Sequence, residues 1–332
     1  MRVQSTTPPY PGMILNLLLL LLGLGLLVWS ADRFVFGAAA VARNLGLPPL
    51  IIGLTIVSMG SSAPEAMVAA SAALEGKLDT AVGNVIGSNI ANITLILGAS
   101  ALLRPLLVSS STLVKEMPLM LAATILAGYL MHDLELSRWD GIILGAAFVG
   151  VMGYLVLSAL RAREKDLLMA EVEDEVPTDI PMAKALLWLT VGMVVLPFAA
   201  DMMVEHAVVI ARHFGLSDLV IGLTIIAVGT SLPELAACIA GLLKGEDDLV
   251  IGNVVGSNLF NILAVLAIPT LIAPGAIDAA AAGRDFYIML ATSLVPLLVL
   301  LLKRNRSFGR PEGALLVLCF IAYQISLFNL TG

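Results

Sequence analysis

The chain has 332 residues, 59% of them hydrophobic and 13% charged, with a mean hydropathy of +0.99. A soluble core of this length could not bury so much apolar surface, so the composition excludes a water-soluble globular protein and predicts one that crosses a lipid bilayer many times. The net charge of −7 identifies no partner, because residues 161–180 carry much of the acidity, and we expect no nucleic-acid partner.

Apolar segments separated by short charged turns follow one another along the chain. A span needs about 20 residues, so there is room for about ten spans and for no sizeable soluble domain. In the first half we expect spans at 15–30 with an amphipathic continuation to 43, then 50–74, 81–103, 117–131 and 141–160. In the second half we expect them at 185–209, 219–243, 249–272, 286–302 and 313–330. The chain thus divides into residues 1–160, an acidic linker at 161–182, and residues 183–332.

Two polar motifs of the first half recur in the second. The string GLTIVSMGSSAPE ends at Glu65 and GLTIIAVGTSLPE ends at Glu234, with eight of thirteen positions identical. Each precedes a second string, GNVIGSNIAN ending at Asn92 and GNVVGSNLFN ending at Asn261. One constant offset separates every matched pair of positions in both strings, which indicates an internal duplication. Five spans per half is an odd number, so we predict an all-α membrane protein with ten transmembrane helices in two inverted five-helix repeats.

Basic residues predict the orientation in the membrane. Alternating the loops between the two sides puts five of the 18 Lys and Arg on the side of the amino terminus and thirteen opposite. The more basic side faces the cytoplasm, so we expect both termini outside and a cytoplasmic linker. Residues 1–12 lack the charged start and small-residue cleavage site of a secretory signal, so we expect the first apolar segment to be retained.

Glu65 and Glu234 fall near the middle of their predicted spans, where a carboxylate costs at least about 2.5 kcal/mol to insert. Lysines and arginines are predicted only in loops and at span ends, so each glutamate needs a cation from solution or is protonated. Serine, threonine and asparagine side chains surround them in the motifs, namely Ser61, Ser62, Ser88, Asn92, Thr230, Ser231, Ser257 and Asn261. Such hard oxygen donors, with no His or Cys in the paired motifs, favour Ca²⁺ or Na⁺ over zinc and copper.

The spacing of these residues predicts one shared cage. Ser61 and Glu65 are four residues apart, as are Ser88 and Asn92, so each pair lies on one helix face, and the second half repeats this spacing. Asn89 and Asn258 lie one residue off these faces, and we expect interhelical hydrogen bonds from them. Hydrogen bonds between apolar helices would explain a single Ser, Thr or Asn in a span. They would not explain a duplicated set of such residues centred on two glutamates without basic partners.

Three other groups of residues receive plainer interpretations. We expect Asp32 and Asp201 to anchor the membrane interface, and Cys238 and Cys319 to be small packing residues. The three histidines fall near loops or interfaces and the chain has no GxSG or GxGD string, so we expect no enzyme.

At its paired motifs the sequence resembles the calcium/cation antiporter superfamily, specifically the prokaryotic type of the sodium/calcium exchanger branch with its two inverted repeats. The resemblance implies that Glu65 and Glu234 bind Ca²⁺ and Na⁺, with the hydroxyl and amide side chains above and the backbone carbonyls of Ser58 and Ala227 as further ligands. It also implies a monomeric transport unit in the plasma (inner) membrane, no organic cofactor, and first and sixth helices that slide past the other eight. Asn261 stands where potassium-dependent relatives carry Asp, which disfavours a K⁺ requirement.

These observations predict a secondary antiporter that exchanges Na⁺ for Ca²⁺ by alternating access. A proton-coupled cation antiporter is the nearest alternative, because a buried Glu can be protonated instead of loaded with Na⁺. A channel is a further alternative, which single-channel currents without a counter-ion would support.

Overall fold

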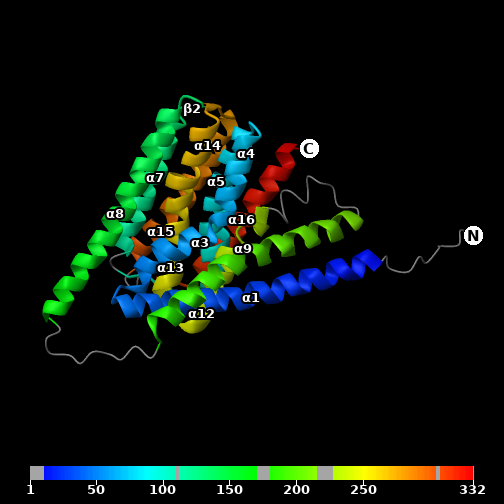
Figure 1. Cartoon of the computed structure of the whole chain (residues 1–332). Coiled ribbons are helices and arrows are strands. Elements are labelled where there is room, and N and C mark those ends of the chain that lie inside the picture. Colours follow the sequence, from blue (N-terminus) through cyan, green and yellow to red (C-terminus); the bar gives the residue numbers. More distant parts are fainter. Residues whose placement is uncertain (1–10, 110–111, 170–179, 215–226, 304–306, 332) are drawn as a thin grey trace, which may run out of the picture.

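Long helices make up the computed structural model, which describes residues 11–109, 112–169, 180–214, 227–303 and 307–331 (Figure 1). Within these ranges eight helical segments are long and apolar enough to cross a bilayer, and nine if the bent pair Leu50–Ser61 and Ala63–Leu74 is one span. The predicted all-α membrane class is therefore confirmed. The predicted count of ten also needs the span at 219–243, and part of that span, like residues 1–10 and most of the linker, lies outside the described residues.

The first half runs through helices, short π-helical segments (η) and two very short strands. Its elements are α1 (Pro11–Leu45), α2 (Pro49–Ile52), η1 (Gly53–Val57), α3 (Ser58–Ser61), α4 (Ala63–Leu74), α5 (Leu78–Ala91), η2 (Asn92–Leu97), α6 (Gly98–Leu103), β1 (Leu106–Leu107), η3 (Thr112–Glu116), α7 (Met117–Leu130), β2 (Glu135–Leu136) and α8 (Arg138–Met169). Because α8 continues to Met169, residues 161–169 of the predicted linker are helical.

In its described parts, the second half follows the element order of the first. Its described elements are α9 (Met182–His213), α11 (Ala227–Gly229), α12 (Leu232–Lys244), α13 (Asp247–Phe260), η5 (Asn261–Val265), α14 (Ala267–Ile272), β3 (Gly275–Ala276), η6 (Ala281–Asp285), α15 (Phe286–Leu302), β4 (Ser307–Phe308) and α16 (Arg310–Thr331). Helices α5 and α13 begin at matched positions, separated by the same offset as the motifs, and so do η2 and η5, α6 and α14, η3 and η6, and α7 and α15. The duplication seen in the motifs therefore extends to local structure.

A break before each glutamate interrupts the helix that carries it. Ser62 and Ser231 have non-helical backbone angles, with φ −85° and ψ 14° in one and φ −91° and ψ 7° in the other. Pro64 and Pro233 stand in the first turn of the helix that restarts, where a missing N–H costs little because that turn has no intrahelical acceptor. The chain bends by 45° at the first of these breaks, which separates α3 from α4.

Each half also contributes to two small antiparallel sheets. β1 pairs with β4 and β2 pairs with β3, so each sheet joins one strand of the first half to one of the second. β1 precedes the η3–α7 segment and β2 follows it, which places the two sheets at opposite ends of the bundle.

α1 and α9 pack closely against each other across the direction of the more upright helices (Figure 1). Glycines permit this approach, because a Cβ on Gly37 would collide with the backbone nitrogen of Leu189, and one on Gly192 would lie 2.5 Å from Cα of Phe34. Their buried apolar residues form a core shared with part of α12 and distinct from the larger core of the remaining bundle.

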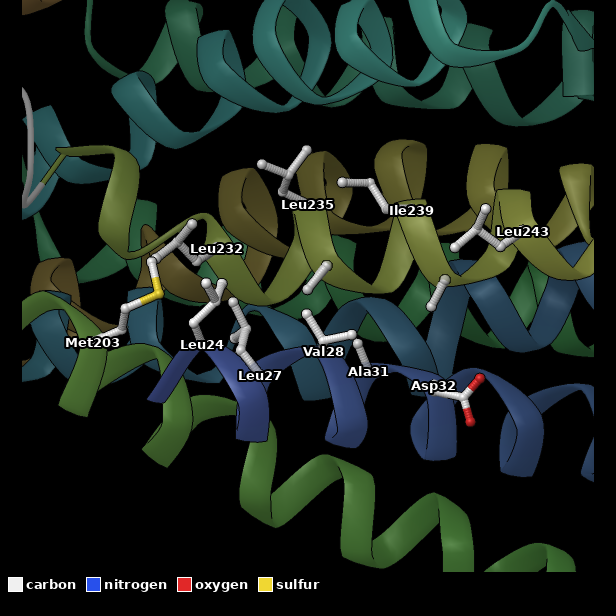
Figure 2. A pocket seen from close by; sticks show the side chains of 12 residues that line it. Leu24, Leu27, Val28, Ala31, Asp32, Met203, Leu232, Leu235, Ile239 and Leu243 are labelled. Atoms are coloured by element: carbon white, nitrogen blue, oxygen red, sulfur yellow. The ribbon is translucent and has the colours of Figure 1, made fainter. Parts of the chain in front are cut away.

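A groove of about 270 Å³ separates α1 from α12 (Figure 2). Leu235, Ile239 and Leu243 line it from α12, Leu24 and Val28 line it from α1, and other apolar side chains complete it. Asp32 stands at one end, where its carboxylate pairs with Lys244 at 2.5 Å. The groove contains neither glutamate of the repeated motifs, so the candidate site lies elsewhere.

Candidate functional site

Glu65 and Glu234 stand in the first turns of α4 and α12, and each side chain is 1% exposed. The free N–H groups of a helix start favour a negative charge, so the preceding breaks place both carboxylates where the backbone stabilises them. Within the described ranges, neither glutamate forms an ion pair with a basic side chain.

A hydrogen bond joins the two repeated motifs directly. The hydroxyl of Ser62 donates to Oε1 of Glu234 over 2.6 Å, a length typical of a hydroxyl bound to a carboxylate. Oε2 of Glu234 and both carboxylate oxygens of Glu65 are buried without a hydrogen-bond partner in the part of the chain that the structure describes. Unpartnered buried carboxylate oxygens are costly, so these three atoms mark a place where a cation would be stabilised.

The second motif of each half supplies amide groups at the start of a π-helical segment. Asn92 begins η2 and Asn261 begins η5, and both side chains are buried. Short π-helical segments occur often at functional sites, because they disturb the regular hydrogen-bond ladder. Nδ2 of Asn92 donates to Oδ1 of Asn258 at 3.1 Å, while Oδ1 of Asn92 and both polar atoms of Asn261 are without partners among the described residues.

The remaining predicted residues differ in how far the structure describes them. Ser61 is buried and donates to Oδ1 of Asn253 at 3.1 Å. Hydroxyls of Ser231 and Ser257 are buried and have no partner in the described ranges. The other predicted positions are Ser58, fully buried with its hydroxyl bonded to its own helix, Ser88, buried at 5% exposed, Thr230, half-buried, and Ala227, whose backbone begins α11.

Two asparagines that contact predicted site residues were not among the predicted ligands. Asn84 donates to the backbone carbonyl of Glu65 at 3.2 Å, and Asn253 accepts from Ser61 and donates to Sγ of Cys238 at 3.4 Å. Asn84 and Asn253 are themselves a matched pair of the second motif, so the duplication carried a signal for them. Cys238 is buried as expected for a packing residue, whereas Cys319 is exposed.

The expectation of interhelical hydrogen bonds is confirmed for Asn258 and wrong for Asn89. Asn258 bonds to Asn92 of the other half, whereas Asn89 donates to the carbonyl of Val85 in its own helix at 3.0 Å. Both residues lie one position from a ligand face, but only Asn258 meets a polar group on the neighbouring helix. Asp32 pairs with Lys244 away from both glutamates.

The donor set fits an ion held by two acids and neutral oxygens. Among the described residues, no three His, Cys, Asp or Glu side chains come together in a group that could hold a metal. Hydroxyl, amide and carboxylate oxygens are the ligands that Na⁺ and Ca²⁺ prefer. The arrangement can therefore bind a hard cation between the two halves of the chain.

Comparisons with known proteins agree with this geometry. The sodium/calcium exchanger protein family matches residues 15–157 and 184–328. The putative antiporter CaxA of Alkalimonas amylolytica is 52% identical, and the match covers 96% of this chain and 100% of that protein. The inner membrane protein YrbG of Escherichia coli is 46% identical over 96% of this chain and 98% of its own.

Solved structures of the sodium-calcium exchanger NCX_Mj have the same fold. The form soaked with 2.5 mM Na⁺ and 10 mM Sr²⁺ is 31% identical, with a TM-score of 0.79 over 93% of this chain and 98% of that one. The form soaked without Na⁺ and Ca²⁺ has a TM-score of 0.81 over 95% of this chain and 99% of that one. The chain described here is thus an integral membrane protein that belongs to the sodium/calcium exchanger family of cation antiporters.

Proposed function

We propose that this antiporter exchanges Na⁺ for Ca²⁺ at one central site that opens to one side of the membrane at a time. The observation that carries the proposal is the pair of buried glutamates, one from each half, without basic partners in the described residues. The bond from Ser62 to Glu234 joins the motifs that carry them. The sodium/calcium exchanger MaX1 of Methanosarcina acetivorans, 29% identical over 94% of this chain, supports the choice of ions.

The same pair of charges explains why transport would be coupled. One Ca²⁺, or Na⁺ ions, would neutralise the two carboxylates and allow the loaded site to change its side of access. An empty site would carry two uncompensated charges in a medium of low dielectric constant, where such charges are strongly disfavoured. Ions would therefore cross only in exchange for other ions.

The proposed ligands come from both halves of the chain. They are the carboxylates of Glu65 and Glu234, the hydroxyls of Ser61, Ser62, Ser88, Thr230, Ser231 and Ser257, the amide oxygens of Asn92 and Asn261, and the backbone carbonyls of Ser58 and Ala227. Unpartnered buried oxygens on Glu65, Glu234, Asn92, Asn261, Ser231 and Ser257 support this set.

The proposed architecture is two inverted repeats, residues 1–160 and 183–332, with ten transmembrane helices. The two small sheets support it, because β1–β4 at one end of the bundle corresponds to β3–β2 at the other with the halves exchanged. We propose that both termini lie outside a prokaryotic plasma membrane. The opposite side, which includes the linker, carries more Lys and Arg and therefore faces the cytoplasm. The Escherichia coli relative named as an inner membrane protein agrees with that location.

Flux in proteoliposomes tests the proposal. Purified protein should take up ⁴⁵Ca²⁺ when an outward Na⁺ gradient is imposed, and the variants Glu65→Gln and Glu234→Gln should abolish that uptake, because each removes one charge that the cation neutralises. Asp201→Asn is the matched control, since Asp201 is an exposed acid on α9, and it should transport like the wild type. Normal Na⁺-driven uptake in either glutamate variant would refute the site.

Proton coupling is a second candidate that one observation favours. Both oxygens of Glu65 lack partners in the described ranges, and a proton would remove the charge of such a carboxylate in an ion-free site. In vesicles without Na⁺, a pH gradient should then drive ⁴⁵Ca²⁺ uptake that an ionophore collapses. Uptake that follows only the Na⁺ gradient would exclude this candidate.

A further inference from the structure

Asn92 is the proposed ligand whose orientation depends most clearly on its neighbours. Its Nδ2 donates to Oδ1 of Asn258 at 3.1 Å, and its Oδ1 is buried without a hydrogen-bond partner in the part of the chain that the structure describes. The two ends of an amide differ, because the nitrogen only donates and the oxygen only accepts. Asn92 can therefore be a cation ligand only while its oxygen, and not its nitrogen, is turned away from Asn258.

The orientation of Asn258 depends in turn on Met120 of α7. Nδ2 of Asn258 lies 3.6 Å from Sδ of Met120, and both residues are fully buried. A thioether sulfur accepts a weak hydrogen bond but has no proton to donate, so this contact favours the orientation in which the nitrogen of Asn258 faces Met120. The oxygen of Asn258 then faces Asn92 and accepts a hydrogen bond from the nitrogen of Asn92. The two contacts together favour one orientation for both amides.

We propose that Asn258 and Met120 are positioning residues that hold the amide oxygen of Asn92 available to the transported cation. The proposal rests on the proposed function and deepens it. Neither residue touches the ion, and each acts through the next along a path from α7 through α13 to η2. Loss of either would let the Asn92 amide turn its N–H₂ group toward the site, where it would repel a cation.

The matching residues of the other half do not form this path. Asn89 donates to its own helix at Val85, and both polar atoms of Asn261 lack partners among the described residues. Met289, which occupies in the second half the position of Met120 and is 1% exposed, receives no asparagine hydrogen bond in the described ranges. Met289 is therefore a matched control for Met120.

Equilibrium binding of ⁴⁵Ca²⁺ to the purified full-length protein, together with KM and kcat of uptake, tests the proposal. Met120→Leu keeps the side-chain volume and removes the acceptor, and Asn258→Ala removes the partner itself. We expect each to weaken Ca²⁺ binding and raise KM, by up to about tenfold for Asn258→Ala, as for one lost hydrogen bond between neutral groups, with kcat little changed. Met289→Leu should match the wild type. Should Asn258→Ala fail to fold, Met120→Leu alone decides the test.

Repeating Met120→Leu in a second variant of the protein distinguishes a positioning role of Met120 from a packing role. Asp at position 92 presents an oxygen at both ends, so it needs no orienting partner. Met120→Leu should therefore leave Ca²⁺ affinity unchanged in an Asn92→Asp background. Equal weakening in both backgrounds would overturn the proposal, as would wild-type affinity in Met120→Leu and Asn258→Ala. No Ca²⁺ binding by the wild type would instead overturn the proposed function.

Discussion

Ser62 joins the two halves of the chain, because its hydroxyl donates to a buried carboxylate of the other half. Ser62→Ala would leave Oε1 of Glu234 without that donor, and a hydrogen bond to a charged group contributes about 1.5–3 kcal/mol. We expect KM for Ca²⁺ to rise about tenfold or more, as measured by initial rates of ⁴⁵Ca²⁺ uptake. Ser62→Thr keeps a hydroxyl and should recover most of the affinity, and Ser71→Ala, at an exposed position of α4, should have no effect. Unchanged KM in Ser62→Ala would show that this bond does not support the site.

The internal duplication made it possible to predict the glutamates and hydroxyls as site residues, but it could not predict which residues they contact. The pairs Ser61 with Asn253 and Asn92 with Asn258 join residues far apart in the chain, and their contact depends on the register of α13 against the first half. Helical periodicity gives the face on which a residue lies, not the neighbour that it meets. For this reason the expectation of an interhelical hydrogen bond was right for Asn258 and wrong for Asn89.

At the scale of elements, the close approach of α13 to the helix that precedes Glu65 holds the two motifs together. A Cβ on Gly256 would lie 2.5 Å from the carbonyl oxygen of Leu54 and 2.7 Å from the hydroxyl of Ser58. Because the nearest atom belongs to the backbone, no change of rotamer can relieve the clash. We expect Gly256→Ala to destabilise the protein by about 1–3 kcal/mol through overpacking, seen as a lower unfolding temperature in detergent.

The control for Gly256 is a glycine with free space around it. A Cβ on Gly150 of α8 would meet nothing within 4 Å, so Gly150→Ala should keep or raise the unfolding temperature, since alanine favours a helix. Equal behaviour of the two variants would show that the α13 contact is not tight. A lower unfolding temperature for Gly256→Ala alone would locate the strain at this crossing.

The length of the apolar segments predicted most of the helices. Local composition explains where the observed helix boundaries differ from the predicted ones. Residues 161–169 look like linker because they are charged, but the same residues are mostly strong helix formers, so α8 runs through them. The strands β1–β4 have two residues each and leave no alternating pattern to detect. The π-helical segments at Asn92 and Asn261 depend on packing that no local pattern records.

At the scale of the whole molecule, α1 packs backbone to backbone against α9, whereas a groove lies between part of α1 and α12. Glycines bring the backbones of α1 and α9 together, and the rings of Trp29 and Trp188 meet edge to face at 6.2 Å. Toward α12 lies the apolar groove of Figure 2, with the ion pair of Asp32 and Lys244 at its end. Tight packing on one side and a groove on the other are what a helix pair needs if it moves as a unit against the bundle.

Cross-linking tests whether that motion is part of transport. In a Cys319→Ser background, cysteines at Asp32 and Lys244 joined by a short reducible dithiol cross-linker should stop ⁴⁵Ca²⁺ exchange, because they tie α1 to α12. Cysteines at Trp29 and Trp188, cross-linked in the same way, join α1 to α9 within one unit and should leave exchange nearly intact. Reduction should restore activity in the first protein. Exchange that continues at the full rate with α1 tied to α12 would mean that these helices do not slide past each other, whereas its loss with α1 tied to α9 would place the motion between those two helices instead.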